Sequence, residues 1–152
     1  ENMNFPNLQR FDCNNNQFIK LPENMNWTNL ISFKCSGNQI THLPENLNFP
    51  NLLYFYCSNN QITKLPENMN FPNLIEFNCS SNQLINLPNN MKYPYLQEFI
   101  CDNNQLTSFP LYILNWRNLE YINYDNNNIE LSQQIARFLY RLENDNINKI
   151  NI

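Results

Sequence analysis

All five cysteines of the chain are spaced by 22 residues, and thiols at such a spacing could do three kinds of chemistry. They could pair as disulfides, bind Zn²⁺ or Cu⁺ as thiolates, or stay protonated as small apolar side chains. Each is the first residue of the same motif, Cys-x-x-Asn-Gln followed by an apolar residue, at Cys13, Cys35, Cys57, Cys79 and Cys101. A fixed period of this length indicates stacked copies of one supersecondary unit.

The spacing favours the third role for the thiols. Equivalent Cβ atoms in neighbouring copies would lie about 5 Å apart, beyond the 3.5–4.5 Å that a disulfide needs. Because the number of cysteines is odd, at least one would stay unpaired. A single inward row of thiols also lacks the tetrahedral geometry of a zinc site. We therefore expect buried, reduced cysteines without metal, which suits a reducing compartment.

Other residues with catalytic potential are few. The single histidine, His42, is expected to face solvent, because its position varies among the copies. The other copies hold Lys20, Lys64, Asn86 and Ser108 there. Glu76 and Glu98 occupy equivalent positions in neighbouring copies, where paired carboxylates could act as acid and base. Without an enclosing pocket, two solvated like charges are the simpler interpretation. We predict that the chain is not an enzyme and uses no cofactor.

The bulk composition argues against two further classes of partner. Charged residues make up 14% of the 152 residues and the net charge is −4, so the clustered basic face of a nucleic-acid-binding protein is not expected. The sequence holds no run of about 18 apolar residues that would predict a membrane span. We expect a cytoplasmic monomer with a protein partner, and neither nucleic acid nor membrane as a ligand.

Aligned on the cysteine, the chain divides into about six copies of one pattern, aromatic-Pro-Asn-Leu-x-x-Phe-x-Cys-x-x-Asn-Gln-apolar-x-x-Leu-Pro. We expect repeats over residues 1–130, with copies at 5–26, 27–48, 49–70, 71–92, 93–115 and 116–130. Residues 1–4 match the pattern of 23–26, so the chain begins within a copy. The interval from Cys101 to Tyr124 is one residue longer than the others, and the extra residue falls in the return segment after Phe109.

Alternation around each cysteine predicts a short strand. Phe55 and Cys57 would share the inward face, while Tyr54 and Tyr56 share the outward one. Successive copies would then form a parallel sheet with strands about 4.8 Å apart. One inward column would hold Phe11, Phe33, Phe55, Phe77, Phe99 and Ile122, and a second the cysteines followed by Tyr124. A proline in each return segment removes a backbone donor, so short 3₁₀ or extended turns are expected there.

The C-terminal segment, 131–152, follows a different pattern. Within 131–143, apolar residues recur at helical spacing, and Ser132 is a plausible N-cap. The apolar positions are Ile135, Phe138, Leu139 and Leu142. We expect a helix that caps the open end of the repeat array, followed by a tail.

The stretch Leu52-x-x-Phe55-x-Cys57-x-x-Asn60-x-Ile62 resembles the leucine-rich repeat signature, L-x-x-L-x-L-x-x-N-x-L. The match recurs in six copies over about five sixths of the chain. The resemblance implies an α/β-type repeat solenoid, a right-handed horseshoe or arc with a parallel sheet on its concave face. It also implies an asparagine ladder in the turns after the strands, made here by Asn16, Asn38, Asn60, Asn82, Asn104 and Asn127.

Two finer resemblances concern the origin of the chain. The Leu65-Pro66 pair resembles the leucine-proline subclass found in bacterial effectors and plant receptors. The recurrent Cys and Asn-Gln are most similar to leucine-rich repeat proteins of large DNA viruses that infect amoebae. This resemblance would imply a viral protein in the host cytoplasm.

The outward strand positions are the candidate binding surface, since the family resemblance implies binding of another protein through the concave sheet. They form three columns: Arg10, Ser32, Tyr54, Glu76, Glu98 and Tyr121; Asp12, Lys34, Tyr56, Asn78, Ile100 and Asn123; and Asn14, Ser36, Ser58, Ser80, Asp102 and Asp125. Tyrosine is enriched in interface hot spots, and Tyr54 and Tyr56 lie together in the middle of the array.

We predict a non-catalytic scaffold for protein–protein interaction. Its expected contact residues are Lys34, Tyr54, Tyr56, Glu76, Glu98, Ile100 and Tyr121. Two alternatives stay open: the recognition module of a larger effector or ubiquitin-ligase-like enzyme, and a structural or self-associating element.

Overall fold

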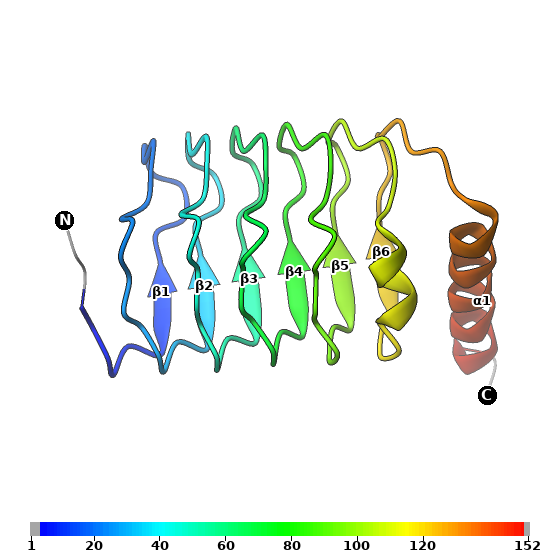
Figure 1. Cartoon of the computed structure of the whole chain (residues 1–152), viewed down its shortest axis with the longest axis horizontal. Coiled ribbons are helices and arrows are strands. Elements are labelled where there is room, and N and C mark those ends of the chain that lie inside the picture. The colour runs from blue at the N-terminus through cyan, green and yellow to red at the C-terminus, as the bar shows by residue number, and fades with distance from the viewer. Residues whose placement is uncertain (1–3, 151–152) are drawn as a thin grey trace.

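A computed structural model describes residues 4–150 and shows a row of similar turns followed by a helix (Figure 1). Each turn contributes one three-residue strand to a six-stranded sheet. The strands are β1 (Arg10–Asp12), β2 (Ser32–Lys34), β3 (Tyr54–Tyr56), β4 (Glu76–Asn78), β5 (Glu98–Ile100) and β6 (Tyr121–Asn123). Residues 1–3 of the predicted repeats and 151–152 of the predicted tail lie outside the described residues.

The sheet is parallel, and its strands follow the order of the chain. Phe55 aligns with Phe33 on one side and Phe77 on the other, so the register repeats the 22-residue period of the sequence. In the longer last interval, Ile122 still aligns with Phe99. The predicted parallel-sheet solenoid with a C-terminal helix is therefore confirmed.

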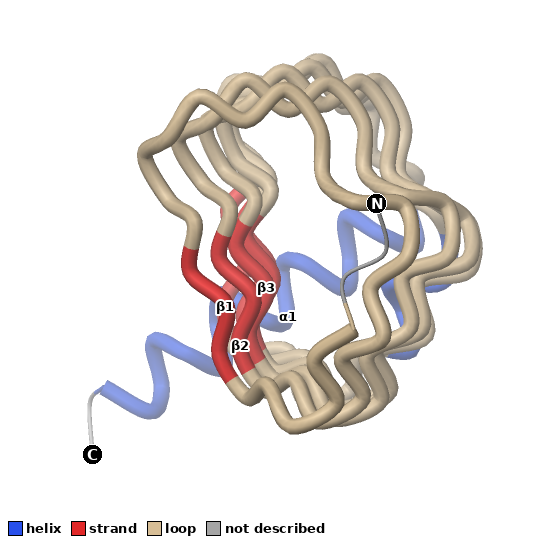
Figure 2. Tube along the Cα trace, turned by 90° about the vertical axis from the view of Figure 1, so that its left-hand side faces the viewer, coloured by secondary structure: helices blue, strands red, loops and turns tan. Residues whose placement is uncertain are grey.

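Two rows of aromatic rings fill the inside of the coil, behind the strands that form one side of it in Figure 2. Along the sheet, the centroids of successive rings from Phe11 to Phe99 lie 5.3–5.6 Å apart. The second row, on the return side, runs through Trp27, Phe49, Phe71, Tyr93 and Trp116. The rows touch edge to face, as between Phe55 and Phe71 at 5.5 Å and 72°. Each turn is thereby packed on the next, as a solenoid requires.

The return side absorbs the one-residue insertion. After Pro110, whose φ is −66°, the chain winds into the 3₁₀ helix η1 (Leu111–Asn115). Ile113 of this helix is buried, and the indole nitrogen of Trp116 donates to the carbonyl of Met91 at 3.1 Å. The insertion thus leaves the sheet register intact.

The C-terminal helix α1 (Gln133–Ile150) packs against η1 at the end of the coil. Ser132 caps it, since its Oγ accepts a hydrogen bond from the N–H of Ile135 at 3.4 Å. Ile135 and Leu139 are buried, while Phe138 and Leu142 are half-buried against the same core. The helix continues past the predicted end at residue 143, because neither glycine nor proline follows to stop it. No helix within the described residues is both long and apolar enough to cross a bilayer.

Candidate functional site

The turn after each strand depends on one residue in the left-handed region. The second residue after each cysteine has φ between 52° and 68°, and the same holds after Tyr124 in the last turn. These residues are Asn15, Gly37, Asn59, Ser81, Asn103 and Asn126. Asparagine and glycine tolerate this conformation best. Sequence reasoning missed it, although the chain's single glycine stands at this position and asparagine fills four of the others.

Asn60 shows the geometry of the asparagine ladder. Its Nδ2 donates to the carbonyl of Cys57 in its own turn at 3.2 Å and to that of Cys35 in the preceding turn at 3.0 Å. Its Oδ1 accepts from the N–H of Ile40 at 3.0 Å. Asn38, Asn82 and Asn104 repeat this pattern and are also buried, whereas Asn127 is half-buried and Asn16, in the first turn, is exposed. The ladder therefore joins each turn to the one before it.

The five thiols point into the core as free, buried side chains. Burial raises the pKa of Cys57 well above its ordinary value, and it does the same to the pKa of Cys35, Cys79 and Cys101. At the first turn, burial raises the pKa of Cys13 to about 11. Protonated thiols out of contact with water are poor nucleophiles. Among residues 4–150, no group of three or more His, Cys, Asp or Glu side chains is arranged to hold a metal ion.

The outward side chains of the six strands form what we call the sheet face. It comprises Arg10, Asp12, Ser32, Lys34, Tyr54, Tyr56, Glu76, Asn78, Glu98, Ile100, Tyr121 and Asn123. In the third predicted column, Ser58 and Ser80 are buried, whereas Asn14, Ser36 and Asp102 are half-buried and Asp125 is exposed. Ser58 donates to the Oγ of Ser36 at 3.0 Å, and Ser80 donates to the Oδ1 of Asn78 at 2.7 Å. Their hydroxyls are thus held inside the turns.

The structure brings three of the predicted contact residues together in one hollow of about 400 Å³, which we call the basic hollow. Lys34, Tyr54 and Tyr56 line it with Arg10, Phe11, Asp12, Ile31 and Ser32. The ammonium of Lys34 lies 5.3 Å from the centre of the Tyr56 ring, within range of a cation–π contact. Asp12 contacts the turn that follows β1, where its Oδ1 accepts the N–H of Asn14 at 3.0 Å.

Glu76 and Glu98 continue the sheet face beyond the tyrosines. They are register partners on β4 and β5, and the carboxylate of Glu76 accepts a hydrogen bond from the hydroxyl of Tyr56. Burial, followed by this bond to Glu76, raises the pKa of Tyr56. Ile100 is half-buried at the end of β5. Tyr121 is separate, because it lines a different hollow between β6 and α1 with Leu142 and Glu143.

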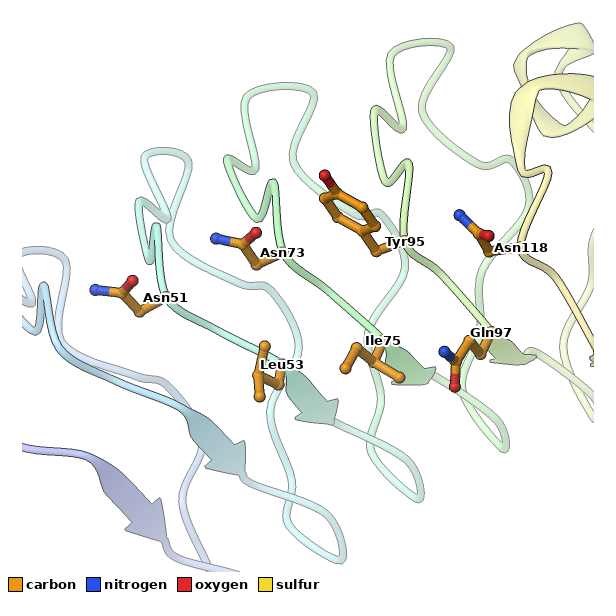
Figure 3. A pocket seen from close by; sticks show the side chains of 7 residues that line it. All are labelled: Asn51, Leu53, Asn73, Ile75, Tyr95, Gln97 and Asn118. Atoms are coloured by element: carbon orange, nitrogen blue, oxygen red, sulfur yellow. The ribbon is translucent and has the colours of Figure 1, made fainter.

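Residues that sequence reasoning did not single out line another hollow of about 380 Å³, here called the entry groove (Figure 3). It lies where the chain enters the strands and is lined by Asn51, Leu53, Asn73, Ile75, Tyr95, Gln97 and Asn118. The Nδ2 of Asn51 and of Asn73 donates to a carbonyl in the preceding turn at 2.9 and 2.8 Å. Tyr95 stands where these copies have asparagine, and 56% of its surface is exposed. The sequence did hold a signal for this groove, namely an aromatic residue at a position where the neighbouring copies have asparagine.

A short apolar stripe joins the two hollows. Ile31, Leu53 and Ile75 immediately precede β2, β3 and β4, and all three are half-buried. Ile31 belongs to the basic hollow, whereas Leu53 and Ile75 belong to the entry groove. The candidate surface is therefore wider than the strands alone.

The remaining catalytic candidate lies apart from this surface. His42 is exposed on the return side, and its Nδ1 is 3.0 Å from the Oγ1 of Thr41. It has no carboxylate or thiol partner among the contacts of the described residues. The hydrogen bond to its neighbour is a local contact of the turn.

Searches with family models and with curated proteins find no match. Among solved structures, InlP of Listeria monocytogenes matches with a TM-score of 0.75 and 28% identity, over 86% of this chain and 38% of that one. YopM of Yersinia enterocolitica matches with a TM-score of 0.61 and 28% identity, over 83% of this chain and 30% of that one.

A leucine-rich repeat protein of Leptospira interrogans matches with a TM-score of 0.58 and 22% identity, over 90% of this chain and 47% of that one. The chain spans less than half the length of each of these proteins. All three come from bacteria, and the resemblance to viral proteins stays a prediction. The chain has the fold of the leucine-rich repeat proteins that are its structural neighbours.

Proposed function

We propose that the chain is a non-enzymatic scaffold that binds a protein partner through the sheet face, with Tyr54 and Tyr56 as anchors. The observation that carries the proposal is the placement of these two rings. Both are half-buried on β3, and both line the basic hollow beside Lys34. Tyrosine presents a large, rigid, amphipathic surface at a small cost in conformational entropy, which is why it recurs in binding hot spots.

Lys34, Glu76, Glu98 and Ile100 extend this surface on the neighbouring strands, and Tyr121 offers a further contact at its end. The aromatic core supports the sheet from behind, so the surface is carried on rigid elements. A rigid surface loses little entropy on binding, which favours affinity. We further propose a monomer in a reducing, cytoplasmic compartment, in keeping with the five free thiols.

Selection of random peptides displayed on phage against the immobilised chain supplies probes for a test. The affinity of the selected peptides is then measured by fluorescence anisotropy for wild type and for the Tyr54→Ala/Tyr56→Ala variant. We expect the variant to bind about tenfold more weakly or worse. Tyr140→Ala is the matched control, because Tyr140 is 68% exposed but lies on α1. Equal affinity of wild type and the double variant would refute the assignment of the sheet face.

A second candidate function, self-association, is favoured by one observation. Ile19 and Ile85, at equivalent positions of the return side, are 64% and 49% exposed and offer an apolar contact to a second copy. Light scattering over a series of concentrations separates the two functions, since a monomeric mass at all concentrations rules out self-association. The third interpretation, a recognition module of a larger enzyme, is decided by sequencing the full reading frame.

A further inference from the structure

We propose that the sheet face binds an extended peptide segment that crosses the strands, with an acidic side chain over β1–β2 and a basic side chain over β4–β5. This inference rests on the proposed function and specifies the chemistry of its partner. It follows from the order of charges along the sheet face, from the spacing of the strands and from the apolar surface between the charged ends.

The first end of the sheet face carries the cations. Arg10 on β1 and Lys34 on β2 line the same hollow, together with Ser32. The carboxylate of Asp12 in this hollow accepts a hydrogen bond from a backbone N–H, so part of its hydrogen-bonding capacity is used within the turn. Two cations beside a hydroxyl suit the carboxylate of an Asp or Glu side chain.

The other end carries the acids. Glu76 and Glu98 are adjacent in register, so their backbones lie one strand spacing apart, about 4.8 Å. Two like charges at this separation repel each other, and a cation placed between them is attracted to both. The carboxylate of Glu76 accepts a hydrogen bond from the hydroxyl of Tyr56, which orients it. A Lys or Arg side chain of the partner fits this end.

The spacing of the two ends sets the spacing of the charges in the peptide. From the middle of β1–β2 to the middle of β4–β5 there are three strand spacings, or about 14 Å. An extended chain advances about 3.3 Å per residue, so the acidic and basic residues should stand about four positions apart. Between them, Tyr54 and the half-buried stripe of Ile31, Leu53 and Ile75 offer an apolar surface. The residues between the two charges should therefore include apolar side chains.

The opposite charges at the two ends also favour a peptide over other ligands. A nucleic acid would meet Glu76 and Glu98 with its phosphates, and an anionic membrane surface would do the same. A peptide can carry both signs in the required order. Electrostatic complementarity of this kind acts mainly on specificity and on the rate of association.

The test uses the peptides selected on wild type that depend on Tyr54 and Tyr56. We expect them to carry Asp or Glu about four positions from Lys or Arg, and exchange of the two charges within a peptide to weaken binding about tenfold. The Lys34→Glu/Glu76→Lys variant should abolish this preference, because the new side chains offset the charge of Arg10 at one end and of Glu98 at the other. Lys64→Glu/Glu67→Lys is the matched control, because it makes the same exchange of charge at exposed residues of the return side.

The outcomes separate this inference from the proposed function. Peptides that depend on Tyr54 and Tyr56 but bind equally after charge exchange would overturn the charge order and leave the sheet face as the binding surface. Loss of the preference in the Lys64→Glu/Glu67→Lys control would equally overturn it, since the effect would then not depend on charges of the sheet face. Selected peptides that bind the Tyr54→Ala/Tyr56→Ala variant as tightly as wild type would overturn both.

Discussion

The hydroxyl of Tyr56 on β3 donates a hydrogen bond to the carboxylate of Glu76 on the neighbouring strand β4. Lys34, on the strand at the other side, lies over the ring of the same tyrosine. One aromatic side chain thus touches both charged regions of the sheet face. This contact holds the anchor ring in place and links the cationic end of the surface to the acidic one.

Replacing Tyr56 with phenylalanine tests this link. Tyr56→Phe removes the hydrogen bond but keeps the ring, so the free energy of unfolding should fall by about 1 kcal/mol or less. Urea unfolding at neutral pH measures the change. Tyr54→Phe is the control, because the Tyr54 hydroxyl makes no hydrogen bond within the described part of the chain. Equal losses in the two variants would contradict the link.

The asparagine ladder should contribute more to the stability of the fold at its buried positions than at its exposed one. Asn60→Ala leaves the N–H of Ile40 without its partner. The carbonyls of Cys57 and Cys35 lose one hydrogen bond each but keep those from Asn82 and Asn38. A stranded buried group costs about 1–3 kcal/mol, so we expect a loss of at least about 1 kcal/mol in thermal or urea unfolding. Asn16→Ala, at the exposed first position of the same ladder, should cost less than half as much. A smaller loss for Asn60→Ala than for Asn16→Ala would argue against the ladder as the joint between turns.

The left-handed position in each turn predicts a stabilising substitution. Ser81 has a φ of 52°, whereas the equivalent Gly37 adopts 68° with a residue type suited to it. Because a residue with a Cβ is strained there by about 1–2 kcal/mol, Ser81→Gly should raise the melting temperature or leave it unchanged. Asn59→Ala, at the same position one turn earlier, should lower it. If Ser81→Gly lowered the melting temperature and Asn59→Ala raised it, the backbone conformation at this position would not limit stability.

The buried thiols predict a loss of stability at high pH. In the unfolded chain a thiol ionises near the reference pKa of 9.0, while burial holds the pKa of Cys57 well above it. Above about pH 9 the folded state therefore binds more protons than the unfolded state, and stability falls by up to about 1.4 kcal/mol per pH unit and thiol. Urea unfolding between about pH 8 and 10.5, in a reductant, measures the slope. Cys57→Ala should make the fall of the unfolding free energy with pH less steep, because one buried thiol is gone. An unchanged slope would contradict the burial of this thiol.

The sequence predicts the solenoid well because its period fixes which residues stack. The spacing of Phe33, Phe55 and Phe77 alone defines the register of the sheet. The alternation around each cysteine predicts which side chains of the strand point inward. The resemblance to leucine-rich repeats adds the role of the asparagines after the strands. These features depend on local spacing, which a single sequence displays in full.

Features that depend on neighbouring turns were harder to predict. Ser58 looks like an outward polar residue, yet it is buried and its hydroxyl donates to Ser36 of the preceding turn. The entry groove forms because Tyr95 of one copy lies beside asparagines of two others, a juxtaposition that periodicity does not mark as special. The helix was predicted only as far as residue 143, because the regular apolar spacing ends there. The structure continues α1 to Ile150.

The inward direction of the thiols is the claim on which the sheet face depends, since the side chains that alternate with them must point outward. The rate of thiol labelling in the native, reduced protein at neutral pH tests it most directly. We expect most of the five cysteines to react only after unfolding in concentrated urea, with Cys13 in the first turn the first to react. Rapid labelling of Cys35, Cys57 and Cys79 in the native state would contradict it, because the tyrosines proposed as anchors would then lie in the core.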